Sequence, residues 1–147
     1  MKYCLAPCIA VLLTLTACDP VSTTKLLIRP IPSPSEKQQV SVALRQIDFV
    51  GNLLQARGFT KKSYDTPHVP LDDQNNLLKE CGHLSYWVRT ESHHTTYARA
   101  CLSSRGVLVS LEDYLSTSAS PATKTLANEL AAEISASVKD VRVEFIQ

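Results

Sequence analysis

The central segment of the chain reads HLSYWVR over residues 83–89, and its side chains alternate with a period of two. Leu84, Tyr86 and Val88 form one set, and Ser85, Trp87 and Arg89 form the other. This alternation is typical of a strand with one buried face. Two further strands are expected over residues 95–102 and 107–111, on either side of the turn sequence Ser103-Ser104-Arg105-Gly106. The middle of the chain therefore predicts a three-stranded meander.

A helix is predicted before this meander. Ser33 suits the N-cap, Pro34 the first helical position and Glu36 the third, which together form a capping box with its proline. Apolar residues then recur at three- and four-residue spacing from Val40 to Leu54, and Gly58 supplies a left-handed stop. One face of this helix should therefore contact the core.

A second helix and a last strand are predicted after the meander. Ser120 and Pro121 open the helix, and its buried stripe comprises Leu126, Leu130, Ile134 and Val138. Residues 141–145 alternate again as a strand. The predicted order α-β-β-β-α-β corresponds to an α+β domain, with an antiparallel sheet of about four strands and two helices on one face.

The cysteines of this domain predict a disulfide. A hairpin turning about Glu91 would place Cys81 opposite Cys101, since both lie ten residues from it. A metal site is the competing interpretation, because His83, His93 and His94 lie between the two cysteines. Zinc sites use tighter ligand pairs than these. We therefore expect a disulfide between Cys81 and Cys101 and no metal, and we interpret His93 and His94 as exposed turn residues.

The N-terminus carries a positive charge at Lys2, an uncharged apolar run over residues 5–15, and the stretch Leu15-Thr16-Ala17-Cys18. This arrangement resembles the signal peptide and lipobox of bacterial lipoproteins. The apolar run is too short to span a bilayer, which needs about 20 residues. The resemblance implies removal of residues 1–17, lipidation of Cys18, a palmitate-type acyl anchor and a periplasmic address. Asp19 slightly favours the inner membrane.

The residues behind Cys18 divide into a tether and a domain. Pro20, Pro30, Pro32 and Pro34 predict an extended lipidated tether over residues 18–34, followed by one α+β domain over residues 35–147. Within the tether, residues 25–29 are apolar enough to dock on the domain as an edge strand. Alternatively, they could contact a partner.

Charge and motifs exclude several functions. Loss of Lys2 with the leader leaves 14 Lys and Arg residues against 14 Asp and Glu residues, so no basic face for nucleic acid is expected. The chain has no G-x-S-x-G, H-E-x-x-H, C-x-x-C, Walker or G-x-G-x-x-G motif. The adjacent acids Glu112 and Asp113 are interpreted as a charged strand end. We therefore expect no enzyme activity and no cofactor.

A partner-binding face is predicted on the first two strands of the meander. If the helices cover Leu84, Tyr86 and Val88, then Trp87, Arg89, Tyr97 and Arg99 are exposed together, and aromatic and arginine side chains are common interface anchors. Alternatively, the loop of residues 59–82 covers this face. The predicted function is a membrane-anchored binding or accessory subunit of the cell envelope, such as a secretion or toxin-immunity component. The alternative is a hydrolase or small-ligand carrier whose site is assembled from scattered residues.

Overall fold

A computed structural model of the chain describes residues 21–31, 35–63, 82–92, 94–114 and 119–146. Six strands form one antiparallel sheet in the order β2-β3-β4-β5-β1-β6. The strands are β1 (Val21–Pro30), β2 (Thr60–Lys62), β3 (Gly82–Glu91), β4 (His94–Ser103), β5 (Gly106–Tyr114) and β6 (Val141–Ile146), and the helices are α1 (Glu36–Ala56) and α3 (Pro121–Ser137).

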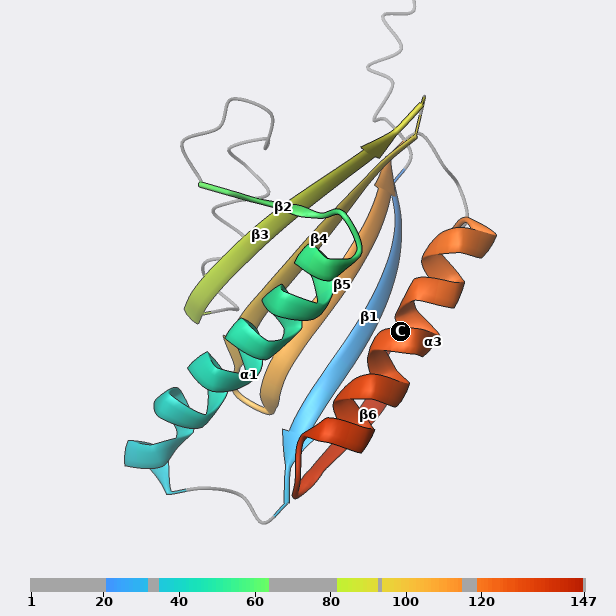
Figure 1. The fold of residues 1–147 in the computed structure, drawn as a ribbon. Coiled ribbons are helices and arrows are strands. Elements are labelled where there is room, and N and C mark those ends of the chain that lie inside the picture. The colour runs from blue at the N-terminus through green and yellow to red at the C-terminus, as the bar shows by residue number, and fades with distance from the viewer. Residues whose placement is uncertain (1–20, 32–34, 64–81, 93, 115–118, 147) are drawn as a thin grey trace, which may run out of the picture.

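Both helices cover the same face of the sheet (Figure 1). We call this the helix face, and the opposite side the far face. One apolar cluster joins the sheet and both helices, with Leu26, Trp87 and Val109 on strands, Val50 on α1 and Leu130 on α3. Helix α1 packs over β2 to β5, whereas α3 packs over β5, β1 and β6. The predicted α+β class and the single helix-covered face are therefore confirmed.

The sheet is larger than predicted, with six strands rather than about four and the order β-α-β-β-β-β-α-β. The main correction concerns residues 21–30, which the sequence predicts as part of a tether. They form β1, and residues 25–29 dock on the domain as expected, but in the interior of the sheet between β5 and β6 and not at its edge. Leu26, Leu27 and Ile28 on this strand are fully buried. Pro30 ends β1 instead of interrupting it, a position at which proline removes no interior ladder bond.

The helix boundaries follow local capping chemistry. Helix α3 begins as predicted, because the Ser120 Oγ accepts a hydrogen bond of 3.1 Å from the Thr123 N–H. The predicted start of α1 is wrong by two residues, since Ser35 and not Ser33 precedes the helix, and the Ser35 hydroxyl donates to Gln38 Oε1. Gly58 has a φ of +82° just after α1, as predicted for a left-handed stop.

The β3–β4 hairpin turns later than predicted. Glu91 pairs with His94, so the turn falls at Ser92, whose φ is +52°, and not at Glu91. Trp87 consequently lies opposite Ala98, and Val88 lies opposite Tyr97. The shift from the predicted register is an odd number of residues, which exchanges the two faces of β4 relative to β3.

Among the described helices, none combines the length and the hydropathy that crossing a bilayer requires. Residues 1–20, which include the predicted leader and Cys18, lie outside the described residues.

Candidate functional site

The predicted partner-binding residues of β3 lie on the helix face, inside the fold. Trp87 is 1% exposed and packs against Gly51 of α1. Arg89 is half-buried, with its guanidinium 4.7 Å from the centre of the Phe59 ring, and its Nη1 donates 3.3 Å to the Arg57 carbonyl. The expectation that Trp87 and Arg89 are exposed is therefore wrong.

Tyr97 and Arg99 lie on the far face, opposite Trp87 and Arg89. Tyr97 stacks on Tyr86, with ring centroids 5.7 Å apart, and the buried Arg99 pairs with Glu112 at 3.1 Å. The expectation that all four residues share one exposed face is wrong, and the odd register shift of the hairpin is the physical reason. These residues stabilise the two sides of the sheet and form no joint surface.

The structure shows that Cys101 forms a disulfide, but its pairing with Cys81 stays a prediction. Cys101 is buried on the far face and is disulfide-bonded. Cys81 and His93 lie outside the described residues. The described residues contain no group of three or more His, Cys, Asp or Glu side chains that could hold a metal ion.

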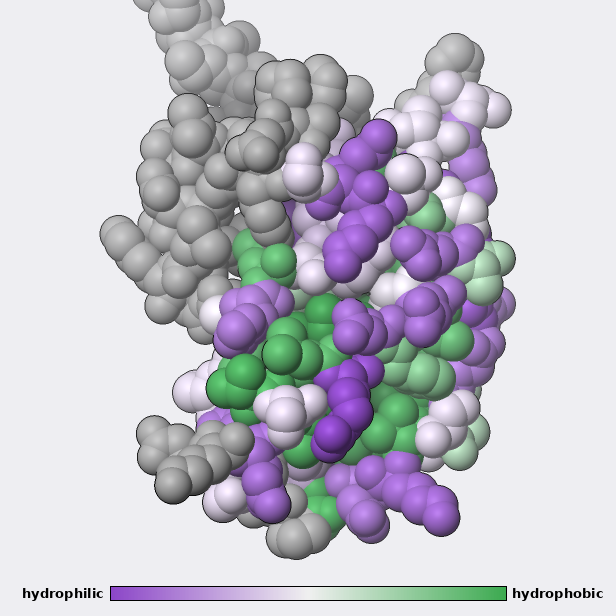
Figure 2. All heavy atoms as spheres, turned by 60° about the vertical axis from the view of Figure 1, so that its left-hand side comes forward, coloured by the Kyte–Doolittle hydropathy of each residue, from purple (hydrophilic) through white to green (hydrophobic). Residues whose placement is uncertain are grey.

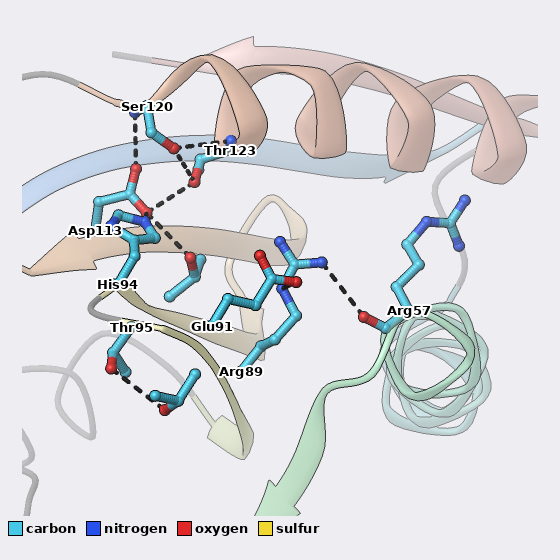
Figure 3. Close-up of polar contacts among 10 residues, drawn as sticks. Arg57, Arg89, Glu91, His94, Thr95, Asp113, Ser120 and Thr123 are labelled. Atoms are coloured by element: carbon cyan, nitrogen blue, oxygen red, sulfur yellow. Dashed lines mark hydrogen bonds and ion pairs between the residues drawn. The ribbon is translucent and has the colours of Figure 1, made fainter.

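A buried carboxylate joins the hairpin to the start of α3 (Figure 3). Asp113 is 0% exposed, and its Oδ1 lies 2.7 Å from Thr123 Oγ1, 2.9 Å from His94 Nε2 and 3.2 Å from Thr96 Oγ1. Its Oδ2 accepts from the Ser120 N–H at 2.9 Å. We call these five residues the Asp113 cluster. The interpretation of Glu112 and Asp113 as a charged strand end is wrong, because both are buried and partnered.

The electrostatics of the Asp113 cluster favour a carboxylate. Burial raises the pKa of Asp113, but hydrogen bonds from Ser120, Thr123 and His94 and the attraction of His94 outweigh it, so the pKa lies below its ordinary value. His94 has a 39% exposed side chain. Within the described ranges, the His94 ring bonds Asp113 and no serine or cysteine side chain. The cluster connects β4, β5 and α3 structurally.

A groove opens at the other end of the sheet, where β1 ends and α3 turns into β6. Its volume is about 600 Å³. Apolar side chains from three parts of the chain contribute to its walls: Ile31 after β1, Val42 and Phe49 on α1, and Val138 and Val141 at the turn into β6. We call it the corner groove.

The corner groove combines exposed apolar surface with available polar groups. Ile31 in the groove is 51% exposed, whereas the exposed Val40 and Leu44 lie on another side of α1. Figure 2 shows the molecule from the α1 side, where apolar surface gathers on the lower half among strongly polar side chains. Within the described part of the chain, Arg45 in the groove has no ion pair and the Gln46 side chain no hydrogen bond. Such surfaces are typical of binding sites.

Sequence patterns contain little that would locate this groove. Its walls come from residues 30–49 and 137–141, which lie far apart in the chain and meet only because β6 pairs beside β1. The one available signal is that Val42 and Phe49 are apolar residues of α1 that both lie beside its core-facing stripe.

Comparisons with protein-family models, with curated proteins and with solved structures find no match for this chain, so the corner groove is interpreted from its own geometry.

Proposed function

We propose that the chain is a membrane-anchored lipoprotein of the bacterial cell envelope, and that its α+β domain binds another protein through the corner groove. The observation that carries the proposal is the groove itself, with its exposed Ile31 and the available guanidinium of Arg45. Arginine beside desolvated apolar side chains is a frequent anchor in protein interfaces. No catalytic role is proposed for the Asp113 cluster.

The position of β1 supports an outward-facing groove. Cys18 lies three residues before Val21, so the lipidated residue would be within about 11 Å of the start of β1. Pro30 and Ile31, at the other end of this ten-residue strand, contribute to the groove. A strand of ten residues spans about 33 Å. The groove would therefore face away from the bilayer, where a partner could reach it.

The anchor is tested by the chemistry of the mature N-terminus. Mass spectrometry of the membrane fraction should find a chain that begins at Cys18 with a diacylglyceryl thioether. Globomycin should block its maturation, and Cys18→Ser should release the domain from the membrane. An unmodified N-terminus would remove the anchor from the proposal and leave the groove to be tested alone.

The groove is tested by site-specific photo-crosslinking. A photoreactive residue at Val42, inside the groove, should form a discrete adduct with an envelope protein, whereas the same residue at Val40, on α1 but outside it, should not. Arg45→Glu should abolish the Val42 adduct, and Arg105→Glu in the β4–β5 turn should leave it unchanged. Equal adducts from Val42 and Val40 would refute a partner seated in the groove.

A small-ligand carrier is a second candidate, favoured by the size of the groove. Its volume of about 600 Å³ lies in the range of small-molecule sites, roughly 300–1,000 Å³. Native mass spectrometry of protein purified from the envelope should then show a bound small molecule that Val42→Glu removes and Val40→Glu retains. Detection of ligand-free protein together with the protein adduct would favour the partner-binding function.

A further inference from the structure

Strand β6 forms one edge of the sheet. It pairs with β1 on one side, and no described strand lies on its other side. Edge strands present free backbone N–H and C=O groups, and proteins commonly protect them with proline, lysine, a bulge or a covering segment. The sequence of β6, Val141-Arg142-Val143-Glu144-Phe145-Ile146, contains neither proline nor lysine. Its pairing with β1 runs without a register shift.

The two sides of β6 have different chemistry. Val143 and Phe145 lie opposite Ile28 and Leu26 of β1, which places them on the helix face. Phe145 is nevertheless 54% exposed, although its neighbour Leu26 is fully buried. Arg142 and Glu144 lie on the far face, where the Arg142 side chain is 70% exposed. The edge thus combines an incompletely covered aromatic ring with one cation and one anion.

We propose that β6 pairs antiparallel with β6 of a second copy of this chain, about a two-fold axis at Val143. In this register Val143 lies opposite its own copy, Arg142 lies opposite Glu144 of the other chain, and Val141 lies opposite Phe145. Each charge then lies opposite an unlike charge of the other chain, and each exposed Phe145 lies opposite the apolar side chain of Val141. The two sheets become one, with the helices of both copies on the same face.

Charge selects this register over its neighbours. Antiparallel pairing that keeps the faces aligned allows the axis to pass through Arg142, Val143 or Glu144. An axis at Arg142 would place two arginines directly opposite each other, and an axis at Glu144 would place two glutamates there. Like charges directly opposite are destabilising, whereas opposite charges stabilise the pair. Only the axis at Val143 satisfies both charges.

The short edge sets the expected strength of the pairing. Six residues bury less surface than a standard stable interface. We therefore expect a reversible association that increases with the concentration of chains. Confinement to a membrane would raise that concentration, but the pairing itself does not depend on the lipid anchor or on the corner groove.

Single cysteine variants determine the register directly. In the proposed dimer, Val143→Cys places two thiols at directly opposite positions, about 4.5–5.5 Å apart at Cα, which a disulfide can bridge. In Arg142→Cys or Glu144→Cys, the two thiols are diagonal neighbours, roughly 7–8 Å apart, which is too far. The full chain is oxidised in whole cells with copper phenanthroline and run on non-reducing gels, with the parent chain as control.

We expect the yield of disulfide-linked dimer from Val143→Cys to be at least ten times the yield from either of the other two variants. Preferential linking of Arg142→Cys or Glu144→Cys would overturn the register, and no linking above the parent at any position would overturn the pairing. Added to Val143→Cys, Arg142→Glu should reduce linking several-fold. Inverting Arg29, Arg142 and Glu144 together restores the cross-strand charges and the ion pairs within one copy, and should restore linking. Equal linking in all three charge backgrounds would refute charge selection.

Discussion

Replacing Asp113 with Asn tests whether the Asp113 cluster stabilises the fold. The carboxylate accepts four hydrogen bonds, and its side chain is 0% exposed. Asparagine keeps the Oδ1 acceptor for His94, Thr96 and Thr123, but its amide group would meet the Ser120 N–H with a second donor. One bond is therefore lost, and the remaining three lose their charge.

The size of the effect follows from these bonds. Hydrogen bonds to charged groups contribute about 1.5–3 kcal/mol, against about 0.5–1.5 kcal/mol between neutral groups. The substitution removes one hydrogen bond to a charged group and weakens three others. The neutral side chain costs less to desolvate, which compensates for part of this loss. The expected destabilisation is about 3 kcal/mol. That is a large part of the roughly 5–15 kcal/mol that folds a typical domain.

The loss in free energy of unfolding is measured by urea titration with tryptophan emission as the signal, because Trp87 is the single tryptophan of the chain and is buried. With a denaturant slope of about 2 kcal/mol per molar, the midpoint should fall by about 1.5 M. Asp48→Asn, an exposed aspartate on α1, is the matched control and should change the free energy of unfolding by less than about 0.5 kcal/mol. A change below about 1 kcal/mol in Asp113→Asn would refute the reasoning.

The same comparison has a definite pH dependence. Because the folded pKa of Asp113 is lowered, its carboxylate contributes stability in full above the unfolded pKa, about 3.9. This contribution is lost as the pH falls through the lower folded value. The difference in unfolding free energy between the parent and Asp113→Asn should therefore be constant near pH 6–7 and decrease below about pH 4. A difference that grows on acidification would contradict the lowered pKa.

Three further perturbations test other parts of the fold. Ser120→Ala removes the α3 cap and should lower the free energy of unfolding by about 1 kcal/mol. Ser35→Ala, at a cap with no side-chain bond to the backbone, should lower it by less than about 0.5 kcal/mol. Equal losses of stability in thermal unfolding would contradict the assignment of the caps. Gly51→Ala would place a Cβ 2.7 Å from Trp87 Cζ2. It should lower the free energy of unfolding by about 1–3 kcal/mol and shift the tryptophan emission. Unchanged emission and stability would show that α1 does not pack closely against this ring. Reduction of the Cys101 disulfide should lower the free energy of unfolding by about 3 kcal/mol in the chain-entropy model. An unchanged urea midpoint in the presence of a reductant would argue against stabilisation by this disulfide.

Local chemistry in the sequence was sufficient for the elements whose signals are local. The Ser120 cap, the Gly58 stop and the strand β3 depend on neighbouring residues, and all three appear in the structure. The expected alternation of burial along β3 does not appear, because Tyr86 and Trp87 are both buried. Strand β1 is predicted only in part, as an edge strand over residues 25–29. Its flanking prolines indicate an extended tether, although its own apolar residues 26–28 indicate burial. A tether and a strand have similar local backbone, so only pairing with distant strands distinguishes them.

The candidate site depended on relationships that a single sequence does not contain. A hairpin register shifted by an odd number of residues moved Tyr97 and Arg99 to the far face, and the corresponding change in turn position is small. Asp113 looked like a surface charge because its four donors come from β4 and from the start of α3. The corner groove likewise exists only after residues 30–49 and 137–141 have been brought together.

The position of β1 also determines when the sheet can form during biosynthesis. Its pairing partners lie near the end of the chain, with Thr23 beside Glu112 and Lys25 beside Ile146. A ribosome releases β1 long before β5 and β6 exist, and contacts between such distant residues are slow to form. The interior of the sheet must therefore stay incomplete until the residues of β5 and β6 have been synthesised.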